Sequence, residues 1–259
     1  MTGSARGRTG GSGYRERVPL VAAAVCPHPP LIVPELAGAA APELDDLRAA
    51  CDAAVGRLYA SGAHSITVIG ADTRGADLSF PFRGSFAPWG LPLEVQIGRL
   101  PDGRIGTDGL PLSLLVGAWL LRRVPLTGDR MTWRMATVAH DEPVDACAAA
   151  GARIGSEGPW ALLVMGDGSA CRGTKAPGYD DPRAAAYDDG VARALAAADS
   201  DALLGLDPEL SAELKVAGRA PWQVLAGAAR AAGGNWRGEL GYYQAPYGVS
   251  YVVANWEPA

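Results

Sequence analysis

Apolar runs alternate with amphipathic stretches in the first part of the chain. Residues 18–25 form an unbroken apolar run that ends at a Pro-rich segment, a pattern typical of a strand buried on both faces. Pro19 lacks an amide hydrogen, so we expect strand pairing to begin just after it. Residues 42–59 carry apolar side chains at helical spacing, and residues 65–69 are again mostly apolar. This strand–helix–strand order predicts a right-handed crossover and parallel pairing.

The rest of the chain continues this alternation without an internal repeat or a linker-like stretch. We predict helices at 112–123, 143–154, 182–198, 207–216 and 221–232, and strands at 93–97, 131–138, 160–165 and 249–254, with 240–244 as the candidate partner of the last strand. Residues 80–90, rich in Phe, Pro, Gly and Trp, are expected to form a long ordered loop. The predicted fold is a single α/β domain over residues 18–259, a three-layer α/β/α sandwich with a mostly parallel central sheet.

Composition and charge narrow the class of partner. The 259 residues are 48% hydrophobic and 20% charged, with a formal net charge of −5, so the chain has enough apolar surface to bury a core. No uninterrupted apolar stretch reaches the roughly 18 residues that a membrane-spanning helix needs. The negative charge argues against a general nucleic-acid binder. We therefore expect a small-molecule partner, with no nucleic acid and no membrane, and leave a homo-oligomer open.

The first residues and the cysteines bear on location. Residues 1–17 consist mostly of Gly, Ser, Thr and Arg, and we expect a disordered leader there. Arg15 and Arg17 before the apolar run loosely resemble a secretory signal, but the run is short and contains Pro19. The four cysteines lie far apart without a C-x-x-C pair, which is typical of a reduced cytosolic protein. The expected location is cytoplasmic.

Polar side chains follow four of the predicted strands. His28, Asp72, His140 and Asp167 each come shortly after an apolar run. Ligands of open α/β sheets bind at the carboxyl ends of the strands, so we expect these side chains at one edge of the sheet. Two histidines and one carboxylate are the ligands of a non-haem Fe(II) centre, and His28, His140 and Asp72 supply such a set.

These residues also have structural interpretations. His28 lies between prolines and is equally explained by a backbone hydrogen bond, and Asp167 lies between two glycines and is equally explained by an Asx-turn. Motifs of phosphate loops, dinucleotide-binding folds and serine hydrolases are absent from the sequence. Four aspartates are typical of a solvated helix face with capping, and we assign them no chemistry: Asp180, Asp181, Asp188 and Asp189.

Several segments, in the same order, resemble the class III extradiol ring-cleavage dioxygenases and their Memo-like relatives. The first is residues 24–35, AVCPHPPLIVPE. Later segments are 165–170, MGDGSA, then 176–183, APGYDDPR, and finally 217–222, AGRAPW. Each motif is short, and their common order carries the resemblance from residue 18 onward. The match is to a divergent actinobacterial branch, which the Ala-, Gly- and Arg-rich composition suits.

The resemblance implies a non-haem Fe(II) oxidoreductase that opens a catechol-like aromatic ring with O₂. Matched residue by residue, it places metal ligands at His28, at Asp72, which stands in place of a family His, and at Glu213. Glu213 lies one turn before Ala217, the position of the last family ligand. The implied cofactor is Fe(II), with Zn²⁺, Mn²⁺ or no metal as alternatives.

The same comparison leaves the activity open. The acid–base His of the family falls at Ala170, so we take His140 and Asp167 as the candidate catalytic residues of a dioxygenase. The alternative is a metal-poor pseudoenzyme that acts as a binding or regulatory domain. A third interpretation is a hydrolase that uses Zn²⁺ or Mn²⁺ in a carboxylate-rich site.

Overall fold

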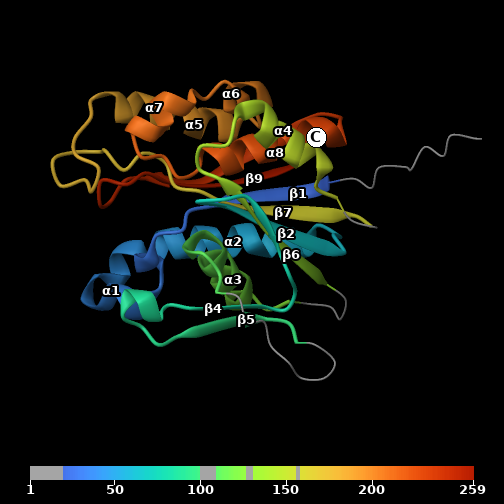
Figure 1. The fold of residues 1–259 in the computed structure, drawn as a ribbon, viewed down its shortest axis with the longest axis horizontal. Coiled ribbons are helices and arrows are strands. Elements are labelled where there is room, and N and C mark those ends of the chain that lie inside the picture. The colour runs from blue at the N-terminus through green and yellow to red at the C-terminus, as the bar shows by residue number, and fades with distance from the viewer. Residues whose placement is uncertain (1–19, 100–108, 127–130, 156–157) are drawn as a thin grey trace, which may run out of the picture.

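The computed structural model describes residues 20–99, 109–126, 131–155 and 158–259, so the leader predicted at 1–17 lies outside them. Within these ranges the main sheet has seven strands: β1 (Leu20–Cys26), β2 (Ser65–Asp72), β3 (Ala76–Leu78), β6 (Thr132–Ala139), β7 (Trp160–Met165), β8 (Trp236–Gln244) and β9 (Tyr251–Pro258). Their order is β3-β6-β2-β7-β1-β9-β8 (Figure 1). The four strands β6, β2, β7 and β1 run parallel, and β3, β9 and β8 pair antiparallel.

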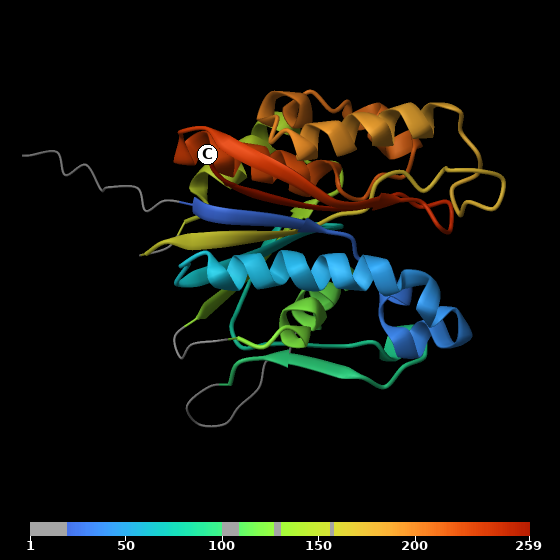
Figure 2. The ribbon, with the colours of Figure 1, turned by 180° about the vertical axis from the view of Figure 1, so that it is seen from behind.

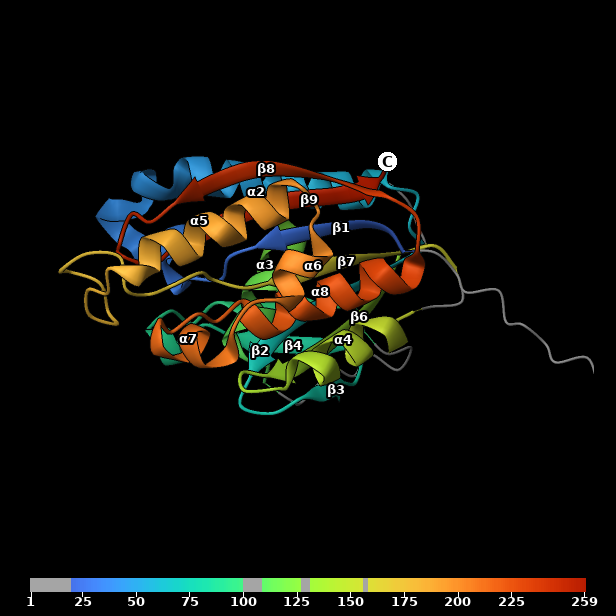
Figure 3. The ribbon, with the colours of Figure 1, turned by 90° about the horizontal axis from the view of Figure 1, so that it is seen from above.

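Helices cover both faces of this sheet, as Figures 1 and 2 show. One face is covered by α2 (Asp45–Ala60) and α3 (Leu112–Arg123). The other face is covered by α4 (Val144–Arg153), α5 (Arg183–Ala196), α6 (Ser200–Leu204) and α8 (Arg219–Ala232), seen from above in Figure 3. Two further short helices, α1 (Pro34–Ala37) and α7 (Pro208–Glu213), lie in the loops. The predicted three-layer α/β/α sandwich is confirmed.

The helix α2 illustrates how the sequence builds the layers. Its first turn carries Asp45 and Asp46, which favour the positive N-terminal end of a helix. Its apolar stripe, with Leu47 and Val55, is fully buried. The helix was predicted from residue 42, but residues Gly38–Leu44 form a 3-10 helix and the α-helix begins only at Asp45.

On the opposite face, α4 and α8 pack with their backbones in near contact. A Cβ atom added at Gly151 of α4 would lie 2.0 Å from the carbonyl oxygen of Val224. A Cβ atom added at Gly227 of α8 would lie 2.2 Å from the carbonyl oxygen of Ala148. The two glycines therefore set the approach of these helices, because a side chain at either position would push them apart.

The region predicted as a long loop at 80–90 contains an additional strand. β4 (Phe82–Ser85) pairs antiparallel with β5 (Glu94–Ile97), and this hairpin packs against α3 outside the main sheet (Figure 1). The Phe-Arg-Gly-Ser sequence of β4 is too short and too mixed to show a strand period. Among the described residues, none of the helices combines the length and the hydropathy that a membrane-spanning helix needs.

Candidate functional site

The carboxyl ends of four parallel strands lie at one edge of the sheet. β6, β2, β7 and β1 are consecutive neighbours, and Asp72 ends β2 beside the end of β6. Cys26 ends β1 beside the end of β7, so the loops that carry His28 and Asp167 start side by side. The predicted convergence of these strand ends is confirmed.

His28 contacts Asp167 at this edge. The backbone N–H of His28 donates to Oδ1 of Asp167 at 2.8 Å, and the ring Nδ1 lies 3.7 Å from the same oxygen. His28 is 8% exposed, and its buried Nδ1 has no hydrogen-bond partner in the described part of the chain. The backbone bond anchors the loop, as the structural interpretation expects, while the imidazole stays available for a further partner.

Tyr251 adds a phenol near this carboxylate. It is the first residue of β9 and is 3% exposed. Burial, and then the negative charge of Asp167, raise the pKa of Tyr251 above its ordinary value. The phenol therefore keeps its proton at neutral pH and is a hydrogen-bond donor. The sequence carried no signal for Tyr251, because its position depends on the antiparallel pairing of β9 with β1.

Asp72 and His140 are neighbours through the backbone. The N–H of His140 donates to the carbonyl oxygen of Asp72 at 3.0 Å. The Asp72 side chain is half-buried and His140 is exposed. The acid–base role assigned to His140 stays a prediction, since its side chain has a place at the edge but no described hydrogen bond.

Glu213 lies away from the strand ends, on α7. Its carboxylate forms an ion pair with Arg183 at 2.8 Å, and its side chain is 58% exposed. Arg183 also binds Asp181 through two hydrogen bonds. Glu213 therefore belongs to an exposed charge network between α7 and α5.

The residues present do not fit a three-ligand metal centre. Across residues 20–99, 109–126, 131–155 and 158–259, no group of three or more His, Cys, Asp or Glu could hold a metal ion. The ligand set His28, Asp72 and Glu213 is thus not brought together. The cause is geometric: β7 separates β2 from β1, which sets their ends about 9–10 Å apart, and Glu213 is held by Arg183.

The turn that follows β7, residues 166–168, is bordered by buried polar atoms without partners. Three such atoms occur in the described chain: His28 Nδ1, Trp222 Nε1 and Ser250 Oγ. A Cβ atom added at Gly166 would lie 3.0 Å from Trp222 Nε1, and one added at Gly168 would lie 2.9 Å from Ser250 Oγ. Buried polar groups are normally hydrogen-bonded, so unpartnered atoms gathered at one turn indicate a place for bound water or a ligand.

Arg219, the first residue of α8, is a second buried group beside this turn. It is 2% exposed and follows Gly218, whose N–H donates to the carbonyl oxygen of Asp167 at 2.8 Å. Its guanidinium donates to the carbonyl oxygens of His140 and Glu142, each at 2.5 Å. No ion pair is found for Arg219 among the described residues. Its guanidinium instead fixes the loop after β6 through these two hydrogen bonds.

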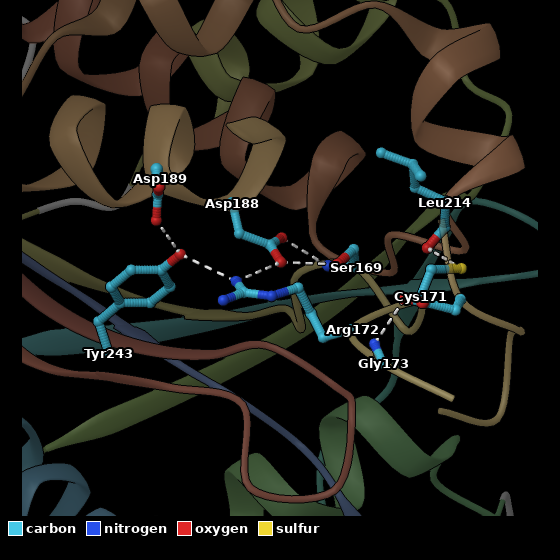
Figure 4. A network of polar contacts seen from close by, with 9 residues as sticks. Ser169, Cys171, Arg172, Gly173, Asp188, Asp189, Leu214 and Tyr243 are labelled. Carbon is cyan, nitrogen blue, oxygen red and sulfur yellow. Dashed lines mark hydrogen bonds and ion pairs between the residues drawn. The ribbon is translucent and has the colours of Figure 1, made fainter. Parts of the chain in front are cut away.

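A polar network holds the continuation of the loop after β7 (Figure 4). The carboxylate of Asp188 accepts from the N–H of Ser169 at 2.8 Å and from its hydroxyl at 2.6 Å. Arg172 donates to Asp188 at 3.3 Å and to the hydroxyl of Tyr243 at 3.2 Å. Tyr243 in turn donates to Asp189 at 2.6 Å. The network ties the loop after β7 to α5 and β8.

Asp188 is fully buried, so its assignment to a solvated helix face is wrong. Burial raises the pKa of this carboxyl, while the bonds from Ser169 and Arg172 act in the opposite direction. The helix period alone gave no reason to turn Asp188 inward. What turns it inward is a pair of donors on the preceding loop, which lies 19 residues away along the chain.

Comparison with known proteins identifies no family for this chain. No protein-family model and no curated protein matches the chain. Among solved structures, the chain is similar to the crystal structure of an uncharacterized protein, JW3007, from Escherichia coli K12. That match has 13% sequence identity and a TM-score of 0.47, and it covers 92% of this chain and 99% of the other.

Proposed function

We propose that this protein is a binding or regulatory domain that holds a small, oxygen-bearing molecule at the carboxyl edge of its sheet without a metal ion. One observation carries the proposal. The unpartnered atoms His28 Nδ1, Trp222 Nε1 and Ser250 Oγ all border the turn at 166–168. An indole N–H is only a donor, so the molecule that pairs with Trp222 must offer an acceptor such as a hydroxyl, carbonyl or carboxylate oxygen.

The surroundings support an uncharged or weakly acidic ligand. Asp167 lies in the turn, and the buried guanidinium of Arg219 lies at the neighbouring loop after β6. Tyr251 adds a neutral phenol. A cytoplasmic location is part of the proposal, since the four cysteines are free thiols and all are buried.

The ring-cleavage dioxygenase is the second candidate function. One observation favours it: a metal-bound histidine usually turns its other ring nitrogen toward a carboxylate, and Nδ1 of His28 faces Asp167 at 3.7 Å. Against it stands the ligand set, because Glu213 is paired with Arg183 on another part of the surface. A catechol-like molecule carries hydroxyl oxygens, so it also matches the oxygen-bearing ligand proposed above.

Titration calorimetry with catechol and with benzoate, in the presence of a chelator, tests the proposal. We expect catechol or benzoate to bind the wild-type protein, and we expect His28→Ala and Trp222→Phe each to weaken binding about tenfold through loss of one hydrogen bond. His64→Ala is the matched control, because His64 is exposed and lies at the opposite, amino end of β2. Absence of binding by both compounds would overturn the proposal.

Metal content separates the two candidates. The protein is loaded anaerobically with Fe(II), desalted and analysed for iron, alongside His28→Ala. We expect no stoichiometric iron in either protein. Stoichiometric iron that disappears in His28→Ala, together with catechol binding only in the loaded protein, would replace the binding domain with the dioxygenase.

A further inference from the structure

A cavity of about 670 Å³ lies at the β3–β6 edge of the sheet, separated from His28 by β2 and β7. This volume is in the range of small-molecule sites. The cavity is lined by residues of β2, β3, β6 and α4, and by Phe80 and Phe82. None of the residues assigned above to the strand-end site, apart from the carbonyl-bearing Glu142, lines it.

The lining of this cavity mixes polar and apolar groups, and part of its apolar lining lies between α4 and the sheet. Figure 3 shows α4 over one face of the sheet near β6. Ile69 of β2 and Val138 of β6 belong to the apolar cluster on this face and line the cavity. Because α4 turns Gly151 toward α8, its neighbouring face presents Ala146 and Ala150 to the cavity. The small side chains on α4 leave room between helix and sheet where larger ones would fill it.

The charges around the cavity are separated along β6. Arg134 lies near the start of β6 and Arg153 is the last residue of α4, and Nη1 of Arg134 donates to the carbonyl oxygen of Gly155 at 2.5 Å. The two guanidinium groups therefore lie at the same end. Glu142 lies just beyond the other end of β6, and Asp77 lines the rim on β3.

We propose that this cavity binds an elongated, mainly apolar carboxylic acid, with its carboxylate at Arg134 and Arg153 and its chain along β6. Guanidinium groups bind carboxylates through paired, charge-assisted hydrogen bonds. Glu142 repels a carboxylate at the opposite end, which fixes the direction of the bound chain. The apolar chain covers the partly buried side chains of Ala136, Ala150 and Ile154 and removes their remaining surface from water. This site is independent of the function proposed for the strand-end edge.

Calorimetry with decanoate, kept below its micellar concentration, tests the proposal on the full chain. We expect one decanoate to bind per protein and its uncharged analogue decanol to bind at least about tenfold more weakly. Arg134→Gln and Arg153→Gln are each expected to weaken decanoate binding about tenfold, for loss of a charge-assisted bond. Neither substitution is expected to change the affinity for decanol.

Matched variants locate the site. Ala150→Trp fills the cavity and is expected to abolish decanoate binding, and its circular dichroism spectrum checks that it folds. Arg193→Gln, an exposed arginine on the last turn of α5, is the control for charge and is expected to bind as the wild type does. His28→Ala is likewise expected to leave decanoate affinity unchanged. Equal decanoate affinity in wild type, Arg134→Gln and Arg153→Gln, or no binding at all, would overturn the proposal.

Discussion

His28 presents both its backbone N–H and its ring Nδ1 to one carboxylate oxygen of Asp167, at 2.8 and 3.7 Å. The loop after β1 and the loop after β7 are thereby fixed to each other at the edge of the sheet. The charge of the same carboxylate also contributes, after burial, to the raised pKa of Tyr251. One side chain thus positions the imidazole and carries the negative charge of the site.

Asp167→Ala is expected to lower the free energy of unfolding by about 1–3 kcal/mol, because the largely buried N–H of His28 loses its acceptor. Asp167→Asn keeps an oxygen acceptor and is expected to cost less. Urea unfolding measures both. Asp77→Ala, at an exposed position on β3, is the control and is expected to be near neutral. An Asn variant as unstable as the Ala variant would show that the negative charge, rather than the acceptor, holds the loops.

Asp188 is expected to make stability depend on pH. Burial raises its pKa above the ordinary 3.8, so between 3.8 and the native pKa the unfolded chain binds fewer protons than the native protein. The free energy of unfolding therefore falls as the pH rises through this window and levels off above it. Asp188→Asn removes this contribution, whereas Asp189→Asn, at an exposed neighbour, retains it. Urea unfolding at closely spaced pH values is the measurement, and a constant difference between wild type and Asp188→Asn would contradict the expectation.

Gly151→Ala and Gly56→Ala are expected to act in opposite directions. A methyl group at Gly151 meets the backbone of α8, so we expect a loss of about 1–3 kcal/mol in stability. Gly56 lies inside α2 with nothing within 4 Å of an added Cβ atom, so alanine there is expected to add about 0.5–1 kcal/mol by helix propensity. Thermal unfolding of both variants checks the sign of each change. A stabilising Gly151→Ala would mean that α4 and α8 do not pack as described.

Two buried tryptophans provide a test of the unpartnered indole. Nε1 of Trp256 donates to the carbonyl oxygen of Leu195 at 2.8 Å, whereas Nε1 of Trp222 has no partner in the described residues. Trp256→Phe is therefore expected to cost about 1–2 kcal/mol more than Trp222→Phe in ligand-free protein. Chemical unfolding compares them. If the two substitutions cost the same, Trp222 already has a tightly bound partner such as a buried water.

The strands and helices with a strong apolar period were predictable. The expected helix at 112–123 and strand at 160–165 match α3 and β7, because each buries a continuous apolar stretch. The three-residue β3 and the mixed sequence of β4 carry no period, and α6 was also missed because it is only five residues long. The local apolar pattern therefore predicted the main strands and helices of the three layers. The elements at the edges depend on tertiary pairing, which the local pattern does not report.

The candidate site was predictable only in part. His28 and Asp167 were found because each follows an apolar strand, and parallel strands end at one edge. Glu213 is predicted as a metal ligand only because it lies one turn before Ala217 in the sequence. That spacing gives no information about the ion pair that Glu213 forms with Arg183. Tyr251 and Asp188 were missed because their burial is decided by strands and loops far away in the sequence.

The central position of β1 has a consequence for how the protein is made. β1 lies between β7 and β9, so one neighbour comes from the middle of the sequence and the other from residues Tyr251–Pro258. During synthesis, β1 cannot complete its pairing until the stretch of chain between residues 26 and 251 has followed it. Its apolar residues lack their second neighbour for all of that time, and long-range pairing of this kind is slow and leaves strand edges exposed to aggregation.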